Sequence, residues 1–133
     1  MVRYVLLDTS VAVRILYGQS PSAAAWFDAQ VAEPDVMVLA SRLLRTELTR
    51  VLRRDGRPVL LRDQIIDYVY TIPLTEATLT EAEAIVPHLK TLDSIHLASL
   101  IGTGLDATVA THDERMKSVA QQIGYNTIDP VTG

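Results

Sequence analysis

The sequence predicts an α/β fold, a three-layer sandwich with helices on both faces of a mainly parallel sheet. Apolar segments at 2–7, 36–40 and 107–110 have the continuous hydrophobic character of strands buried on both faces. Helical segments separate these strands, and that alternation is typical of a parallel sheet. At 133 residues the chain suits one compact unit, so we expect residues 1–133 to form a single domain.

In the first half of the chain, start and stop signals bound three expected helices, at 10–17, 20–33 and 41–55. Gly18 and Gly56 follow the first and third of these helices as stop signals. Ser20 and Pro21 suit the N-cap and the first position of the second. Ser41 follows the strand at 36–40 and can cap the long third helix.

In the second half, we expect four helices at 60–70, 75–85, 91–101 and 113–123. Gly104 and Gly124 follow the last two as stop signals. Short strands are expected at 71–74, 107–110 and 127–128. Pro73 lacks an amide hydrogen and therefore places the strand at 71–74 on an edge of the sheet.

Composition excludes several kinds of protein. Hydrophobic residues make up 48% of the chain and charged residues 21%, which is enough for a packed core and argues against disorder. The absence of cysteine excludes disulfide frameworks, thiolate zinc sites and cysteine nucleophiles, and fits a reducing cytosol. The apolar run at 2–7 is too short for a signal peptide or a membrane span. We therefore expect a soluble, cytoplasmic protein that does not enter a membrane.

The net charge of −4 argues against simple electrostatic binding to nucleic acid, but the charges are unevenly distributed. Residues 42–62 hold seven arginines and two acids, whereas residues 63–96 hold six acids and one lysine. Such a basic stripe could grip nucleic-acid phosphates, with Arg50, Arg53 and Arg54 as candidates. A solvated helix face in an arginine-rich chain is the alternative, and the sequence leaves both open.

Two aspartates directly follow predicted strands. Asp8 comes after the strand at 2–7 and Asp113 after the strand at 107–110. Ligands of open α/β sheets bind beyond the carboxyl ends of the strands, so both side chains should reach that crevice. Either aspartate could instead cap the helix that follows it.

Two further acids fall on the apolar faces of predicted helices. Glu47 shares its face with Leu44, Leu48 and Val51, and a buried carboxylate there needs a cation, a hydrogen-bond network or a cleft. Its alternative is an ion pair with Arg50 or Arg54. Asp93 lies in the first turn of its helix, beside His96, Leu97 and Leu100, where the helix dipole favours a negative charge.

Four carboxylates at one end of the fold indicate a site for Mg²⁺ or Mn²⁺ rather than zinc. Such a cation polarises a phosphoryl oxygen and activates a bound water for in-line attack. Ser10 and Thr111 could orient that water, or could serve as a helix cap and a strand-end hydrogen bond. His96 could be a ligand or a proton shuttle, although a core histidine with one hydrogen bond is the favoured interpretation.

Four segments together resemble the signature blocks of PIN-domain proteins, and in particular the VapC toxins of toxin–antitoxin pairs. These segments are Leu7-Asp8-Thr9-Ser10-Val11, the run from Thr46 to Arg54, the run from Leu92 to Ala98, and Thr111-His112-Asp113. The resemblance extends from the first strand to about Gly124. It implies a PIN fold, a Mg²⁺- or Mn²⁺-dependent endoribonuclease that acts on RNA, a homodimer, and inhibition by a VapB-type antitoxin. By the same resemblance Asp8, Glu47, Asp93 and Asp113 form the acidic site, assisted by Ser10 or Thr111.

Two other classes of protein fit the sequence less well. A phospho-acceptor receiver domain needs adjacent acids after its first strand and a lysine late in the sheet, and the sequence has neither. A catalytically silent PIN-like binding module is opposed by the intact set of acids. If an antitoxin restrains the enzyme, we expect its tail to place an arginine or lysine among the four acids. The rest of that tail would follow the apolar residues of the early helices.

Overall fold

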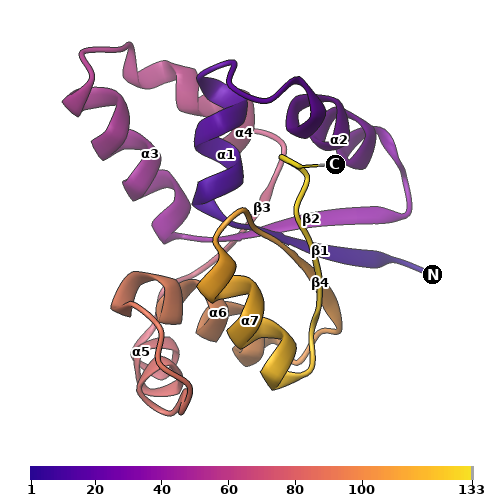
Figure 1. Cartoon of the computed structure of the whole chain (residues 1–133), viewed down its shortest axis with the longest axis vertical. Helices are drawn as coiled ribbons and strands as arrows, with labels where there is room; N and C mark the ends of the chain where they lie inside the picture. Colours follow the sequence, from indigo (N-terminus) through magenta and orange to yellow (C-terminus); the bar gives the residue numbers. More distant parts are fainter. Residues whose placement is uncertain (133) are drawn as a thin grey trace.

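The computed structural model describes residues 1–132 and contains a five-stranded sheet between two layers of helices (Figure 1). All strand pairs are parallel, in the order β3-β2-β1-β4-β5. The strands are β1 (Arg3–Leu7), β2 (Val36–Ser41), β3 (Tyr70–Ile72), β4 (Ala107–Ala110) and β5 (Asn126–Ile128). The predicted three-layer α/β fold is therefore confirmed, with β3 at an edge as Pro73 required.

The helices divide between the two faces of the sheet. On one face lie α1 (Thr9–Leu16), α2 (Pro21–Ala32), α3 (Leu43–Arg54) and α4 (Asp63–Ile66). On the other face lie α5 (Glu76–Glu83), α6 (Thr91–Thr103) and α7 (Glu114–Ile123). No helix within residues 1–132 is long and apolar enough to cross a lipid bilayer.

Two hydrophobic cores, one on each face, hold the layers together. Alternate residues of β1 divide between them, since Leu6 packs with Leu97 and Met116 of α6 and α7 while Leu7 packs with Leu44 and neighbouring residues. These side chains are almost completely buried, which explains the continuous apolar character of the strands. Gly104 and Gly124 end α6 and α7 with positive φ angles of 68° and 115°, as their stop signals predicted.

The predicted helix over 60–70 is wrong. A 3₁₀ turn (Val59–Arg62) and the single turn of α4 replace it, and Tyr70 already belongs to β3. The residues Val69 to Ile72 are β-branched or aromatic, and Tyr70 pairs with Leu39 of β2. Strand pairing in the sheet therefore outweighs the helical spacing of the apolar residues.

The strand order places a topological switch point at the carboxyl ends of β1 and β4. From β1 the sheet extends through β2 to β3 on one side, and through β4 to β5 on the other. The amide of Asp8 donates a hydrogen bond of 3.0 Å to the carbonyl oxygen of Ala110, so the two strand ends meet. This is where parallel α/β sheets bind their ligands.

Candidate active site

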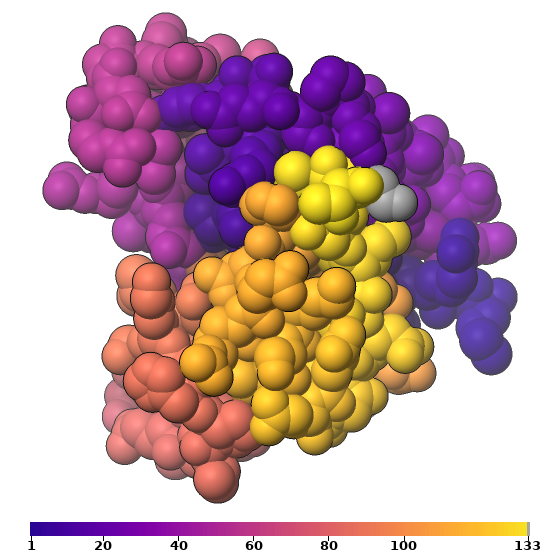
Figure 2. Space-filling model, in the orientation of Figure 1, coloured from indigo at the N-terminus to yellow at the C-terminus, as the bar shows by residue number. Residues whose placement is uncertain are grey.

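Four acidic side chains gather around this switch point. Asp8 follows β1 and Asp113 follows β4, whereas Glu47 comes from the middle of α3 and Asp93 from the first turn of α6. In Figure 2 a notch separates the α3 region from the segment that leads into α6. Burial raises the pKa of Asp93, and the charges of Asp8, Asp113 and Glu47 raise it further. The four acids therefore lie close enough to repel one another.

The Asp8 carboxylate is held by two hydroxyls. It is 3% exposed, and its Oδ2 accepts hydrogen bonds from Ser10 Oγ at 2.7 Å and Thr111 Oγ1 at 2.8 Å. Its side chain makes no capping bond to α1, which is opened by the Asp8 backbone carbonyl. The helix-cap interpretation of the Asp8 side chain is therefore wrong, because both donors hold it in the crevice.

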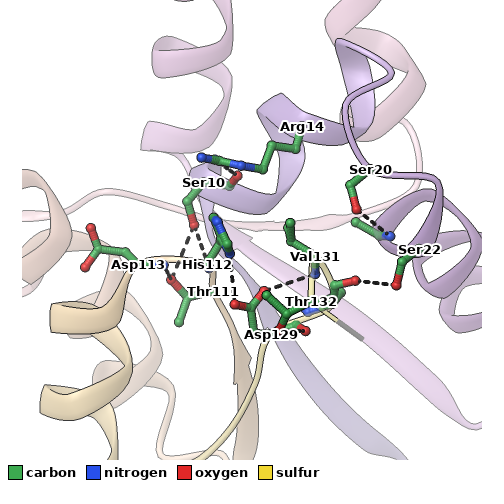
Figure 3. Close-up of polar contacts among 12 residues, drawn as sticks. Ser10, Arg14, Ser20, Ser22, Thr111, His112, Asp113, Asp129, Val131 and Thr132 are labelled. Carbon is green, nitrogen blue, oxygen red and sulfur yellow. Dashed lines mark hydrogen bonds and ion pairs between the residues drawn. The ribbon is translucent and has the colours of Figure 1, made fainter.

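The two hydroxyls also tie the strand ends together (Figure 3). Thr111 Oγ1 accepts a hydrogen bond of 3.1 Å from the amide of Asp113, and Ser10 Oγ accepts one of 3.0 Å from the amide of His112. The Ser10 and Thr111 oxygens are 3.3 Å apart. Thr111 thus makes the strand-end hydrogen bond that was its alternative role, whereas Ser10 lies inside α1 and does not cap it.

Asp113 does cap its helix, as the alternative interpretation predicted. Its Oδ1 accepts a hydrogen bond of 2.8 Å from the amide of Met116 at the start of α7. Its other carboxylate oxygen makes no hydrogen bond within residues 1–132. Capping therefore fixes the orientation of the carboxylate without occupying both of its oxygens.

Glu47 is paired with His96 instead of with an arginine. Its Oε1 contacts His96 Nε2 and accepts a hydrogen bond of 2.7 Å from Thr9 Oγ1. Burial acts to raise the pKa of Glu47, but the hydrogen bonds from His96 and Thr9 outweigh burial and leave it lowered. The predicted alternative of a pair with Arg50 or Arg54 is wrong.

His96 is buried, at 1% exposed, but it bonds to the acidic cluster rather than to the core. Burial acts to lower its pKa, whereas the hydrogen bond to Glu47 and the charges of Asp8, Glu47 and Asp93 raise it, and the raising effects prevail. Its Nδ1 is buried without a hydrogen-bond partner in the described part of the chain. The hydrogen bond to Glu47 and the charges of the acidic cluster thus favour the protonated imidazole.

Asp93 makes no side-chain hydrogen bond to residues 1–132, and both burial and the neighbouring acids disfavour its charge. Its half-buried position, followed by the charges of Asp8 and Asp113, raises its pKa to about 6. The dipole of α6 favours a negative charge at this position, but burial and repulsion outweigh it.

The donor set fits a hard divalent cation. Among residues 1–132 no three acidic or histidine side chains already form a closed metal-binding group. Each of the four acids nevertheless keeps at least one carboxylate oxygen free of hydrogen bonds to those residues. These oxygens are Asp8 Oδ1, Glu47 Oε2, Asp113 Oδ2 and both oxygens of Asp93. Oxygen donors without sulfur are the ligands that Mg²⁺ and Mn²⁺ prefer.

Sequence reasoning missed the contact that holds the C-terminal segment. Asp129 Oδ2 lies 2.8 Å from His112 Nδ1, and Asp129 Oδ1 accepts a hydrogen bond of 3.0 Å from the amide of Val131. Ser22 of α2 donates a hydrogen bond of 2.8 Å to the Pro130 carbonyl (Figure 3). Burial acts to raise the pKa of Asp129, but its bonds to His112 and Val131 lower it. This segment braces the loop that carries Asp113.

Sequence reasoning also missed His88, Lys90 and Arg115. These residues line a cavity of about 230 Å³ together with Asp93 and Asp113. Lys90 lies three positions before Asp93 and Arg115 two positions after Asp113, so proximity to the acids was the available signal.

The arginine stripe lies along α3 and only part of it is free. Arg50 and Arg53 are exposed and make no ion pair within residues 1–132, whereas Arg54 pairs with Asp55 at 2.9 Å. The Arg57 guanidinium lies 3.9 Å from the centre of the Tyr17 ring. Arg57 therefore links the segment after α3 to the residue that follows α1, and Arg54 is engaged with its neighbour Asp55.

Comparison with known proteins agrees with this architecture. The PIN domain family model matches residues 5–122. The chain is 29% identical over 135 residues to Ribonuclease VapC46 of Mycobacterium tuberculosis, covering 95% of this chain and 97% of the relative.

Two solved structures have the same fold. A toxin–antitoxin complex from Klebsiella pneumoniae superposes with a TM-score of 0.70 at 16% identity, covering 95% of this chain and 97% of its own. The VapBC2 complex from Rickettsia felis, bound to a promoter DNA fragment, gives 0.73 at 12% identity over 95% and 99% of the two chains. With the switch-point acids in place and the family model spanning most of its length, the chain belongs to the PIN-domain family.

Proposed function

We propose that this chain is a Mg²⁺- or Mn²⁺-dependent endoribonuclease and the toxin of a type II toxin–antitoxin pair. One observation carries the proposal: four acids at the switch point each keep a carboxylate oxygen free of hydrogen bonds to residues 1–132, while hydroxyls, a backbone amide and His96 orient three of them, Asp8, Asp113 and Glu47. A relative named as a ribonuclease and structural neighbours that are toxin–antitoxin complexes support it. We further propose a homodimer that acts on cytoplasmic RNA.

Asp8, Asp93 and Asp113 are the best placed to hold the cation, with Glu47 as a fourth ligand. When bound, the cation polarises the phosphodiester and lowers the pKa of an attacking water. Thr111 and Ser10 hold the Asp8 carboxylate in place by donating hydrogen bonds to its Oδ2. His96 and Thr9 both bond to Oε1 of Glu47, which leaves Oε2 free of hydrogen bonds to residues 1–132. The chain's contribution is thus the orientation of the carboxylates.

An antitoxin would act at two places. An arginine of its tail would pair with the free oxygens of the four acids and displace the cation. The remainder would lie in a hollow of about 550 Å³ beside α1, α2 and α4, which is lined by Phe27, Leu60 and Tyr68 and by the acids Asp28 and Asp63 among others. Phe27 is itself part of the core, whereas Leu60 and Tyr68 are exposed. This hollow suits a segment that is basic and partly apolar.

The test is cleavage of a structured RNA by the purified protein with Mn²⁺ and with EDTA. We expect cleavage in Mn²⁺, no cleavage in EDTA, and none with Asp8→Asn, which keeps the shape of the side chain but loses its charge. Co-expression with the product of the adjacent reading frame should relieve the growth arrest that the toxin causes. Cleavage that persists in EDTA, or in a folded Asp8→Asn protein, would overturn the proposal.

A further inference from the structure

Beside the acidic cluster, a cavity of about 230 Å³ is lined by basic as well as acidic side chains. Asp93 and Asp113 form its acidic part, and His88, Lys90 and Arg115 form its basic part. All three basic residues are exposed to solvent. The cavity therefore opens to the surface next to the free oxygens of two candidate metal ligands.

These basic side chains lack the ion pairs that cations elsewhere in the chain make. Arg54 pairs with Asp55 at 2.9 Å and Arg62 with Asp63 at 3.8 Å, whereas within residues 1–132 neither Lys90 nor Arg115 has a carboxylate oxygen within 4 Å. Both nevertheless share a cavity with two carboxylates. Their positive charges are thus available to an anion from solution.

The fold fixes the basic residues at the rim of the site. Lys90 immediately precedes α6, whose first turn carries Asp93, and Arg115 lies in the first turn of α7, which Asp113 caps. Both helices begin at the cavity, so their dipoles add to the positive potential of the side chains. An anion that enters the cavity therefore meets this positive potential as well as the charges of the two acids.

A phosphodiester of an RNA strand matches this arrangement. Lysine and arginine bind phosphate oxygens, and arginine can do so through two parallel hydrogen bonds. The acids repel a phosphate unless a cation lies between them, so the basic side holds a phosphate beside the cation site instead of at it. The geometry points to His88, Lys90 and Arg115 as a binding site for the backbone phosphate adjacent to the scissile one, an inference that rests on the proposed ribonuclease function. Because phosphate contacts carry no sequence information, this site positions the strand and does not select its bases.

Binding of a fluorescent single-stranded RNA oligonucleotide in EDTA, followed over a range of salt concentrations, tests this inference without requiring cleavage. The plot of log Kobs against log salt has a negative slope, and each lost phosphate contact reduces the magnitude of that slope by about 0.7 for a single strand. We expect that decrease for Lys90→Gln and for Arg115→Gln, and about twice that decrease for the double variant. The control is Arg3→Gln, because Arg3 is exposed at the opposite end of the sheet, at the start of β1.

Cleavage in Mn²⁺ supplies the second measurement. The KM of the double variant should be several-fold higher than that of the wild type, and its kcat should stay within twofold. The reason is that the lost contacts are to a backbone phosphate that does not take part in the reaction. A double variant with an unchanged salt slope and KM overturns the phosphate site while the ribonuclease proposal stands. Failure of the wild type to bind the oligonucleotide also overturns it. Altered slopes in a protein that never cleaves RNA would support the site and refute the proposed activity.

Discussion

Replacing Asp93 with asparagine should make the metal-free protein more stable while abolishing its activity. Asparagine keeps the size of the side chain and removes its charge. In wild type that charge is half-buried, makes no hydrogen bond to residues 1–132, and is repelled by Asp8, Asp113 and Glu47. The substitution therefore removes an unfavourable interaction and loses no native hydrogen bond of the side chain.

The size and sign of this effect follow from the raised pKa of about 6. A shift of roughly two pKa units corresponds to about 3 kcal/mol, which solvent screening at a half-buried site reduces to about 1–2 kcal/mol. Because the pKa in the folded state exceeds that in the unfolded state, ionisation of Asp93 costs nothing below about pH 4. The cost grows between about pH 4 and 6 and is complete above the folded pKa. The Asp93→Asn protein should thus be more stable than the wild type at pH 8, and the two proteins should have similar free energies of unfolding in acid.

Thermal unfolding in EDTA at pH 8 and pH 4.5 measures the difference. At pH 8 we expect the Tm of Asp93→Asn to lie about 4–8 °C above that of the wild type, and at pH 4.5 most of this gap should vanish. Asp28→Asn, an exposed substitution on α2, is the control and should change Tm little. Addition of Mn²⁺ should raise the Tm of the wild type but not that of Asp93→Asn. An equal or lower Tm for Asp93→Asn at pH 8 would refute the repulsion argument.

Two further substitutions test other parts of the site. Thr111→Val removes a fully buried hydroxyl that donates a hydrogen bond to Asp8, so urea unfolding should show a loss of about 2 kcal/mol and RNA cleavage should fall. The control is Thr108→Val, because Thr108 lies on β4, just before Thr111, and makes no side-chain hydrogen bond to residues 1–132. Arg50→Gln should weaken RNA binding at low salt and lower its salt slope by about 0.7, because Arg50 lies on the side of α3 that carries Glu47. Arg53 lies farther round the helix from Glu47, so Arg53→Gln should have less effect. Unchanged salt slopes in both variants would show that the stripe is a solvated surface and not an RNA-binding one.

Most of the fold follows from local signals in the sequence. Ser20 caps α2 with a hydrogen bond from the amide of Ala23, Pro21 occupies its first position, and Gly104 ends α6 in the left-handed conformation. These features depend on residues within one turn of each other, so the sequence contains all of the information they need. The helix prediction for residues 60–70 failed because the end of this segment pairs with β2, which lies about thirty residues away in the chain.

The positions of Asp8 and Asp113 followed from the ends of two apolar strands, but their individual hydrogen bonds did not. Both residues precede a helix and both fit the pattern of an N-cap, yet only Asp113 uses a carboxylate oxygen in that way. The Asp8 carboxylate instead accepts a hydrogen bond from Thr111, a residue 103 positions away in the chain. Both aspartates have the local sequence of a helix cap, so only the pairing of β1 with β4, which brings Thr111 to Asp8, distinguishes their hydrogen bonds.

The distribution of charge shows most clearly where sequence reasoning ends. The sequence drew attention to the arginines of residues 42–62 and assigned residues 63–96 to an acidic region in which Lys90 was outnumbered. In space those acids separate, because α4 and α5 lie on opposite faces of the sheet (Figure 1). Lys90 is left beside Arg115, from a segment 25 positions later, at the cavity that Asp93 and Asp113 share. Meanwhile Arg54 and Arg57 of the conspicuous stripe are engaged with Asp55 and Tyr17. The proposed phosphate site therefore depends on which cations near the switch point lack a carboxylate partner within residues 1–132, and a count of charges along the chain cannot identify them.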